Sequence, residues 1–203
     1  MSIARIAVLV SGGGTNLGAL IKAEREGKLT SGKIALVISN KADAYALQRA
    51  KDAGIPTATV LKKECGTQEA FEDRITSLLV ENKIDLIVLA GFMAILSERF
   101  TSAYPERIIN VHPSLIPSFC GKGFYGLYVH EAALSYGVKV TGATVHFVNE
   151  VPDGGRIIMQ KAVAIRDDDT PKTLQKRVMR LAEWKILPAA VEKVSAELMA
   201  GKA

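Results

Sequence analysis

The sequence predicts an α/β fold in a single domain, with a mostly parallel sheet flanked by helices and an antiparallel hairpin at the C-terminal end of the sheet. Short runs rich in β-branched residues alternate with longer amphipathic segments, which is the pattern of a sheet covered by helices. The early runs are apolar at nearly every position, and this indicates strands buried on both faces. With 203 residues, the chain has the length of one domain with a sizeable core.

The first half of the chain accounts for the parallel part of the sheet. Strands are expected at 6–10, 33–39, 57–61, 85–91 and 107–111, and helices at 16–26, 44–54 and 68–83. The last of these helices has apolar residues near the 3.6-residue period, at Phe71, Ile75, Leu78 and Leu79. Strands and helices that alternate in this order are typical of a Rossmann-like sheet.

The second half of the chain has a different pattern. A glycine- and aromatic-rich segment, SFCGKGFYGLY, leads into a short helix, and strands are expected at 141–148 and 156–165. Because the connection NEVPDGG between these strands is too short for a helical crossover, we expect them to pair antiparallel. The rest of the chain is expected to be helical from Pro171, which suits a first helical turn, with a break or kink at Pro188.

The composition is that of a soluble globular protein, with 48% hydrophobic and 23% charged residues. No run approaches the roughly 20 apolar residues of a membrane span, and the run 6–10 is too short for a secretory signal. We therefore expect a cytoplasmic protein that does not bind a membrane. Cys65 and Cys120 do not have the spacing of a CxxC pair, and the histidines lack ligand spacing, so neither a disulfide nor a metal site is expected.

The positive charges are dispersed along the chain. A net charge of +5 without a dense basic tract favours a phosphorylated small molecule over nucleic acid as the partner. One local concentration lies near the C-terminus, at Lys172, Lys176, Arg177, Arg180 and Lys185. On its own, that group is most simply explained as a solvated helix face.

The glycine-rich segment SGGGTN, residues 11–16, lies between the first strand and the first helix. Consecutive glycines let the main chain approach a ligand closely, and N–H groups at a helix start favour an anion. The segment is not a Walker A loop because no Lys-Ser/Thr follows, and Leu17 stands where a dinucleotide motif has its last glycine. A phosphate monoester site is therefore predicted, with an ordinary tight turn as the alternative.

A second candidate site lies where the strand 107–111 runs into NVHPS. Asn110 and His112 are two residues apart in an extended segment, so their side chains are expected to point together into the crevice at the carboxyl ends of the strands. Pro113 keeps His112 out of helical geometry. An amide beside an imidazole can hold negative charge on a developing oxyanion. A structural histidine is the alternative.

Asp153, in the PDGG segment, is a candidate partner for His112. If it reaches the imidazole, its charge is expected to raise the pKa of His112 and to favour the imidazolium. An Asp-Gly turn in a hairpin is the alternative. His130 is expected on the surface of a helix, and His146 is expected either to face the sheet or to support the site.

Most of the chain is spanned, in order, by the segments SGGGTN, SNKADAYAL, VLAGFMAILS, NVHPSLIPSF, GATVHFV and PDGG. Together they closely resemble the phosphoribosylglycinamide formyltransferases, the folate-dependent enzymes of purine synthesis. The resemblance implies one formyltransferase domain over 1–203, with a nucleotide-binding half at about 1–110 and a folate-binding, closing half at 111–203. It also implies transfer of a formyl group from 10-formyltetrahydrofolate to the amine of glycinamide ribonucleotide, without a metal, by a monomer or homodimer.

The resemblance assigns roles to individual residues. Asn110 and protonated His112 are implied to stabilise the oxyanion, with Asp153 orienting the histidine and helping to pass a proton through water. The phosphate and ribose of the ribonucleotide are implied to contact Gly13, Gly14, Thr15, Asn16, Arg180 and Glu183. The folate is implied to contact Gln68, Met93, Ala94, Ile95, Leu96 and Asn110.

The chain departs from the family pattern at several positions. Ala94 and Gln68 stand where family members often have arginines, and 120–130 differs from the shorter family loop. The anchoring of the folate tail and the role of this loop are therefore left open. Methionyl-tRNA formyltransferase and formyltetrahydrofolate hydrolase share the core but would need a further C-terminal or N-terminal domain. A non-catalytic nucleotide-binding module would leave the polar residues of NVHPS and PDGG without a role.

Overall fold

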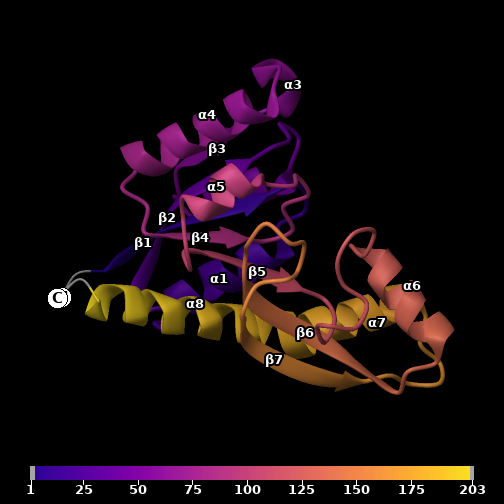
Figure 1. Ribbon diagram of the computed structural model, residues 1–203. Helices are drawn as coiled ribbons and strands as arrows, with labels where there is room; N and C mark the ends of the chain where they lie inside the picture. Colours follow the sequence, from indigo (N-terminus) through magenta and orange to yellow (C-terminus); the bar gives the residue numbers. More distant parts are fainter. Residues whose placement is uncertain (1–2, 202–203) are drawn as a thin grey trace.

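The computed structural model of the chain describes residues 3–201 and consists of one sheet with helices on both faces (Figure 1). The seven strands have the order β3-β2-β1-β4-β5-β6-β7. Their bounds are β1 Ala4–Val10, β2 Gly32–Ser39, β3 Thr57–Thr59, β4 Leu86–Leu89, β5 Ile108–His112, β6 Val140–Phe147 and β7 Ile157–Ala164. The pairs from β3 to β5 are parallel, and the pairs β5–β6 and β6–β7 are antiparallel. The predicted α/β class and the antiparallel hairpin are therefore confirmed.

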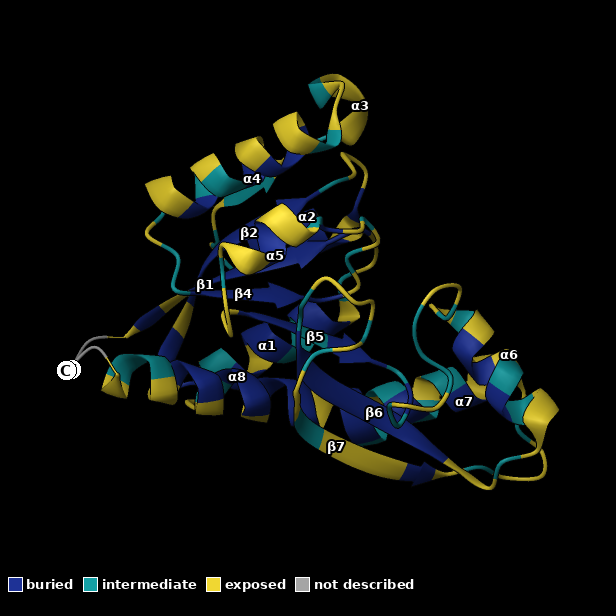
Figure 2. Cartoon of the chain, in the orientation of Figure 1, coloured by how far each residue is buried: buried dark blue, intermediate teal, exposed yellow. Residues whose placement is uncertain are grey.

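The helices bury both faces of the sheet. Their bounds are α1 Thr15–Arg25, α2 Tyr45–Asp52, α3 Lys62–Cys65, α4 Gln68–Glu81, α5 Glu98–Ser102, α6 Leu127–Tyr136, α7 Pro171–Val178, the π-helix η1 Met179–Glu183 and α8 Trp184–Ala200. Side chains alternate along β1, so Val8 and Val10 join a core cluster with α1, α7 and α8, while Ala7 and Leu9 join a second cluster with α4 and α5. In Figure 2 the central strands are buried, and the edge strand β7 is largely exposed.

Local signals set the starts of two predicted helices. At the start of α4, the side chain of Thr67 accepts a hydrogen bond from the Ala70 N–H at 3.1 Å. Before α7, Thr170 and Thr173 form a reciprocal capping box, and Pro171 occupies the first turn. Both helices begin where the sequence predicted. Within residues 3–201, no helix combines the length and the apolar character that crossing a membrane requires.

The structure differs from the sequence prediction in two connections and within one helix. The short helices α3 and α5 were not predicted, because an element of about one turn is too short to show a helical period. Of the break or kink expected at Pro188, the break does not occur, since α8 continues through this residue. Pro188 has no N–H, so it removes only the hydrogen bond to the carbonyl of Trp184, the first residue of α8. The π-helix η1 ends just before this residue, so the regular series of α-helical hydrogen bonds is already interrupted there.

The topology brings three strand ends to one edge of the sheet. From β1 the chain first builds β2 and β3 on one side and then crosses to β4 and β5 on the other. In the register, Leu9 aligns with Leu89, and Leu89 aligns with Asn110. The segments that follow β1, β4 and β5 therefore emerge side by side at the point where the strand order reverses, which is where α/β sheets of this kind bind ligands.

Candidate active site

The glycine-rich loop lies at the carboxyl end of β1, as predicted. Gly14 has a φ of 67°, and a Cβ added to it would lie 2.6 Å from the Cβ of Ala46, so this position requires glycine. The carbonyl of Gly12 accepts a hydrogen bond from the Ala46 N–H at 3.0 Å. The carbonyl of Gly13 accepts one from Arg49 Nε at 2.8 Å. Because α1 then begins without a side-chain cap, its first N–H groups can receive an anion.

Asn16 and Glu183 form a buried pair that joins the start of α1 to η1. Asn16 Nδ2 donates to Glu183 Oε2 at 2.7 Å, whereas Asn16 Oδ1 is buried and has no partner among the described residues. Burial raises the pKa of Glu183 to about 7, although the hydrogen bond from Asn16 acts in the opposite direction. A buried acceptor without a partner, beside a carboxyl that titrates near neutral pH, suits the hydroxyl groups of a ligand.

A cavity of about 1070 Å³ lies between α1 and the segment formed by η1 and α8. Thr15 and Arg180, both expected at the phosphate, line it together with Arg49, which the sequence did not single out. The basic group near the C-terminus is divided by the fold. Arg180 and Lys185 line the cavity, whereas Arg177 forms an ion pair with an aspartate just before α7.

Polar side chains from three segments meet at the carboxyl end of β5. The antiparallel register places Asn110 opposite His146, and Asn110 Nδ2 lies 3.2 Å from His146 Nε2. Asp153 reaches the same place from the connection between β6 and β7. Its Oδ2 lies 3.4 Å from His112 Nδ1, and its Oδ1 lies 3.5 Å from His146 Nε2. The structure therefore brings together Asn110, His112 and Asp153 and adds His146, whose place the sequence left open.

The hydrogen-bond partners determine where the imidazole protons lie. The carbonyl of Phe119 lies 2.8 Å from His112 Nε2, and the carbonyl of Phe147 lies 2.8 Å from His146 Nδ1. A carbonyl only accepts, so each of these two nitrogens carries a proton. The other ring nitrogen of His146, Nε2, faces both the amide of Asn110 and Asp153 Oδ1. In His112, Nδ1 faces the Asp153 carboxylate and forms an ion pair when it is protonated.

Burial decides the net pKa shift of His112. The pKa of His112 is lowered because burial, the largest influence, disfavours the imidazolium and the nearby His146 adds to this effect. The charge of Asp153 and the hydrogen bond to Phe119 favour the imidazolium without outweighing burial. The expectation that the pKa of His112 is raised is therefore wrong in its net direction. Burial would raise the pKa of Asp153, but His146, His112 and the Gly121 N–H together hold it below its usual value.

Part of the glycine- and aromatic-rich segment, residues 119–126, contacts this polar cluster directly. Besides the Phe119 carbonyl on His112, the Gly121 N–H donates to Asp153 Oδ2 at 2.8 Å. The α6 helix follows, and its His130 is fully buried, with no partner for either ring nitrogen among the described residues. Burial, with a smaller effect of His112, lowers the pKa of His130 to about 4. The expectation of a surface histidine is therefore wrong, because His130 shares the buried face of α6 with Ala133.

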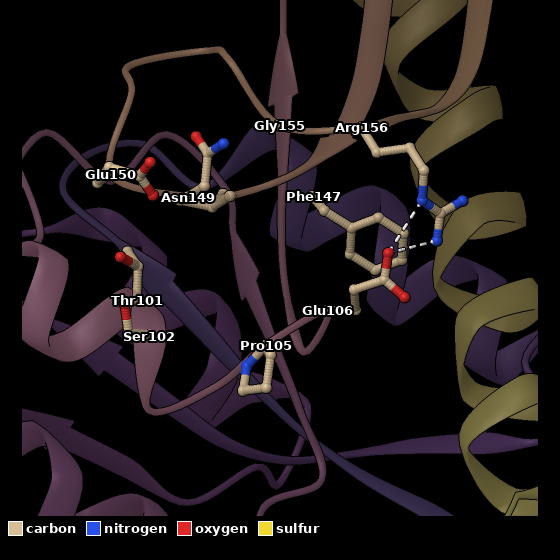
Figure 3. Close-up of a pocket in the computed structure, with 10 residues that line it drawn as sticks. Thr101, Ser102, Pro105, Glu106, Phe147, Asn149, Glu150, Gly155 and Arg156 are labelled. Carbon is tan, nitrogen blue, oxygen red and sulfur yellow. Dashed lines mark hydrogen bonds and ion pairs between the residues drawn. The ribbon is translucent and has the colours of Figure 1, made fainter.

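The connection that carries Asp153 is anchored at its base. The Phe147 N–H donates to the Arg156 carbonyl at 2.9 Å, which pairs the two ends of the connection. Arg156 also donates twice to Glu106 Oε1, at 2.9 and 2.7 Å, and its guanidinium lies 4.6 Å from the centre of the Phe147 ring (Figure 3). These side chains line a cavity of about 270 Å³ beside the connection. They hold its ends where Asp153 can reach β5.

Four of the residues expected to contact folate lie in the loop after β4 and fall into two groups. Met93 and Ile95 are exposed, whereas Leu96 is buried in the core cluster that includes α4, with Ala94 packed against it. The Met93 N–H donates to the hydroxyl of Ser11 at 2.7 Å, which ties this loop to the end of β1. Of these four residues, Met93 and Ile95 are thus the two with exposed apolar side chains.

Gln68, also expected near the folate tail, is engaged within the protein. Its Nε2 donates to Glu72 Oε1 at 2.6 Å and to the Ile95 carbonyl at 3.0 Å. Glu72 is buried and also accepts from the N–H and the hydroxyl of Ser97, at 2.6 and 2.5 Å. Gln68 therefore fixes the loop that carries Met93 and Ile95 onto α4. Among residues 3–201, no group of three or more His, Cys, Asp or Glu side chains is placed to hold a metal ion.

A family model described as formyl transferase matches residues 4–191, nearly the whole chain. The chain belongs to the formyl transferase family. Within this family, it is 44% identical over 188 residues to the phosphoribosylglycinamide formyltransferase of Haemophilus influenzae, covering 93% of this chain and 85% of that protein. It is 48% identical over 192 residues to the human trifunctional purine biosynthetic protein adenosine-3, covering 95% of this chain but only 18% of that longer protein.

Solved structures of formyl transferases share the fold described above. The phosphoribosylglycinamide formyltransferase of Brucella melitensis has a TM-score of 0.88 and 42% identity, covering 96% of this chain and 97% of that one. Glycinamide ribonucleotide transformylase 1 of Symbiobacterium toebii has a TM-score of 0.89 and 39% identity, covering 96% of this chain and 89% of that one. The predicted Rossmann-like architecture and the family resemblance are both confirmed.

Proposed function

We propose that this formyl transferase moves the formyl group of 10-formyltetrahydrofolate to the amine of glycinamide ribonucleotide. The observation that carries the proposal is the convergence of Asn110, His112 and Asp153 at the end of β5, with Asp153 Oδ2 lying 3.4 Å from His112 Nδ1. This cluster and the glycine-rich loop emerge at the same edge of the sheet. The names of the relatives described above support the choice of substrates.

The polar cluster has the groups that formyl transfer requires. Attack of the amine on the formyl carbon creates a negatively charged oxygen and leaves a proton to be moved to the departing nitrogen. Neutral His112, whose pKa is lowered, can take up that proton. The negative charge that develops beside it then favours the imidazolium, as does Asp153. The Nε2–H of the imidazolium, which contacts the Phe119 carbonyl in the structure, would turn to the oxygen and stabilise it together with the Asn110 amide, until the proton is passed on through water held near Asp153.

The ribonucleotide is proposed to bind across the start of α1. Its phosphate would contact the N–H groups from Gly13 to Thr15 and the side chain of Arg180. One ribose hydroxyl would donate to Asn16 Oδ1 and another would hydrogen-bond to Glu183. The buried Asn16 Oδ1, which has no partner among the described residues, would then have one. This arrangement directs the amine of the substrate toward β5.

The folate is proposed to lie against the loop after β4. The exposed side chains of Met93 and Ile95 supply apolar contact for its ring system, and the fixed loop keeps that surface in place. Ala94 and Leu96 support the loop from below. Since the amide of Gln68 is engaged within the protein, anchoring of the folate tail through this residue is not part of the proposal.

The proposal is tested by mixing the protein with 10-formyltetrahydrofolate and glycinamide ribonucleotide and following the absorbance of the deformylated folate. We expect an absorbance change that depends on the ribonucleotide and is strongly reduced by His112→Ala. Deformylation at the same rate with water as the only acceptor would instead indicate a hydrolase. No deformylation under either condition would indicate a binding module.

A further inference from the structure

We propose that Arg49 is a positioning residue that orients the glycine-rich loop so that its N–H groups bind the phosphate of a sugar phosphate. This inference rests on the proposed function for the identity of the phosphate ester and extends it to a residue outside the loop. Arg49 lies on α2, and its Nε donates to the Gly13 carbonyl at 2.8 Å.

The geometry of the peptide groups explains how this contact acts. In a trans peptide the C=O of one residue and the N–H of the next point in opposite directions. The Gly12 and Gly13 carbonyls are both drawn toward α2, by the Ala46 N–H at 3.0 Å and by Arg49 Nε at 2.8 Å. The N–H groups of Gly13 and Gly14 are therefore turned away from α2. Within residues 3–201, neither N–H donates to another protein group.

These two N–H groups continue into the start of α1. The first hydrogen bond of this helix runs from the Gly18 N–H to the Gly14 carbonyl, at 2.9 Å. The N–H groups of the three residues between them precede that bond and are also available. Gly14, with φ of 67°, turns the chain between the two sets of donors. Successive main-chain donors in such a turn form a concave anion site.

The guanidinium of Arg49 is itself held in one orientation. It lies 5.0 Å from the centre of the Tyr45 ring, an arrangement in which a cation stacks on an aromatic face. Its Nη1 would lie 3.7 Å from a Cβ added to Gly18, so the group also rests against the first turn of α1. Arg49 lines the same cavity as Thr15 and Arg180. The contact to Gly13 is therefore made by a rigid donor at the edge of the predicted phosphate site.

Two substitutions separate positioning from charge. In Arg49→Gln, the side-chain amide nitrogen stands at the same number of bonds from the main chain as Arg49 Nε, so a donor to Gly13 is kept while the charge is lost. In Arg49→Met, the corresponding atom is a methyl group, and donor and charge are both lost. Arg74→Gln, at an exposed arginine of α4, is the matched control.

The test measures binding of ribose 5-phosphate by calorimetry and the amide chemical shifts of Gly13 and Gly14 during the titration. We expect Arg49→Met to weaken binding about tenfold and to move both amide signals in the ligand-free protein, whereas Arg49→Gln stays within about threefold of the parent. The thermal midpoint of each variant is recorded alongside. Equal weakening in both variants would assign the effect to charge and overturn the proposal, and so would unchanged binding in Arg49→Met.

This measurement does not depend on formyl transfer. A protein that binds ribose 5-phosphate with the expected Arg49 dependence but transfers no formyl group would refute the proposed function and leave the role of Arg49 standing. In the active enzyme, Arg49→Met is expected to raise KM for the ribonucleotide about tenfold while kcat at saturation stays within about twofold, because the residue does not touch the reacting atoms.

Discussion

The two sides of the crevice recognise charge in different ways. At the end of β1 the polar groups are main-chain N–H groups, oriented by contacts with α2. At the ends of β5 and β6 they are buried or half-buried side chains, and the charge of His112 and of Asp153 each affects the pKa of the other. A change in a side chain that orients a main-chain site weakens the site without abolishing it as long as the turn is kept, whereas a side-chain site is lost with any one of its members. The following predictions test that contrast, from the largest expected effect to the smallest.

The largest effect is expected at the side-chain site. His112→Ala removes the imidazole that carries the proton and holds the oxyanion, so kcat should fall about 100- to 1,000-fold. Binding of ribose 5-phosphate should be unchanged, because the phosphate is held by the other side of the crevice. Steady-state kinetics and calorimetry on the same preparation give both values. An unaltered kcat would remove His112 from the mechanism.

The main-chain site should be sensitive to the turn itself. Gly14→Ala introduces a side chain at φ of 67° and places its Cβ 2.6 Å from the Cβ of buried Ala46. We expect a loss of about 3 kcal/mol in the free energy of unfolding, from backbone strain and overpacking together. Gly12→Ala is the control, because nothing lies within 4 Å of its added Cβ. Urea unfolding measures both, and equal stabilities would contradict the crowding argument.

Because of the buried pair of Asn16 and Glu183, the free energy of unfolding should depend on pH. Burial raises the pKa of Glu183 from its usual value of 4.5 to about 7 in the folded protein. Between these values the folded state keeps a proton that the unfolded chain has lost, so this group's contribution to stability falls as pH rises, by about 3 kcal/mol at most.

Glu183→Gln should remove this contribution, so the free energy of unfolding should fall less steeply as pH rises. Denaturant unfolding at pH values from 5 to 8 measures the slope in both proteins, with Glu150→Gln on an exposed connection as the matched control. A slope that does not change in Glu183→Gln would show that the carboxyl is not titrating in this range.

The smallest effect is expected in the loop after β4. Gln68→Ala removes the hydrogen bonds to Glu72 and to the Ile95 carbonyl, and it should cost about 1 kcal/mol of stability. We expect KM for the folate to rise severalfold while ribose 5-phosphate binding is unaffected. Gln48→Ala, which loses only a surface contact to Asp52, is the control. A change in sugar phosphate binding would mean that the two sides of the crevice are coupled.

Features carried by a single segment were predictable from the sequence. The glycine-rich turn and the spacing of Asn110 and His112 each need only one strand end and its loop. The place of His146 was not predictable, because alternation along a strand fixes a face of the sheet but not what lies opposite. The burial of His130 was not predictable because α6 has apolar residues around most of its circumference, so the sequence pattern does not indicate which face of the helix is buried.

Protonation was the least predictable property. The sequence suggests that Asp153 approaches His112, and the charge of Asp153 does raise the pKa of the histidine, as expected. The opposing contribution comes from burial of the imidazole, and the sequence does not reveal the packing that buries it. The short helices α3 and α5 were missed for a different reason, since their existence depends on tertiary contacts more than on local periodicity.

A single carboxylate joins three separate parts of the site. Asp153 meets His112 on β5, His146 on β6 and the main chain at Gly121. Its removal would leave each of these partners to rearrange independently, so a double-mutant cycle between Asp153 and either histidine should be strongly non-additive. Free energies assigned to these residues one at a time would therefore sum to more than their joint contribution.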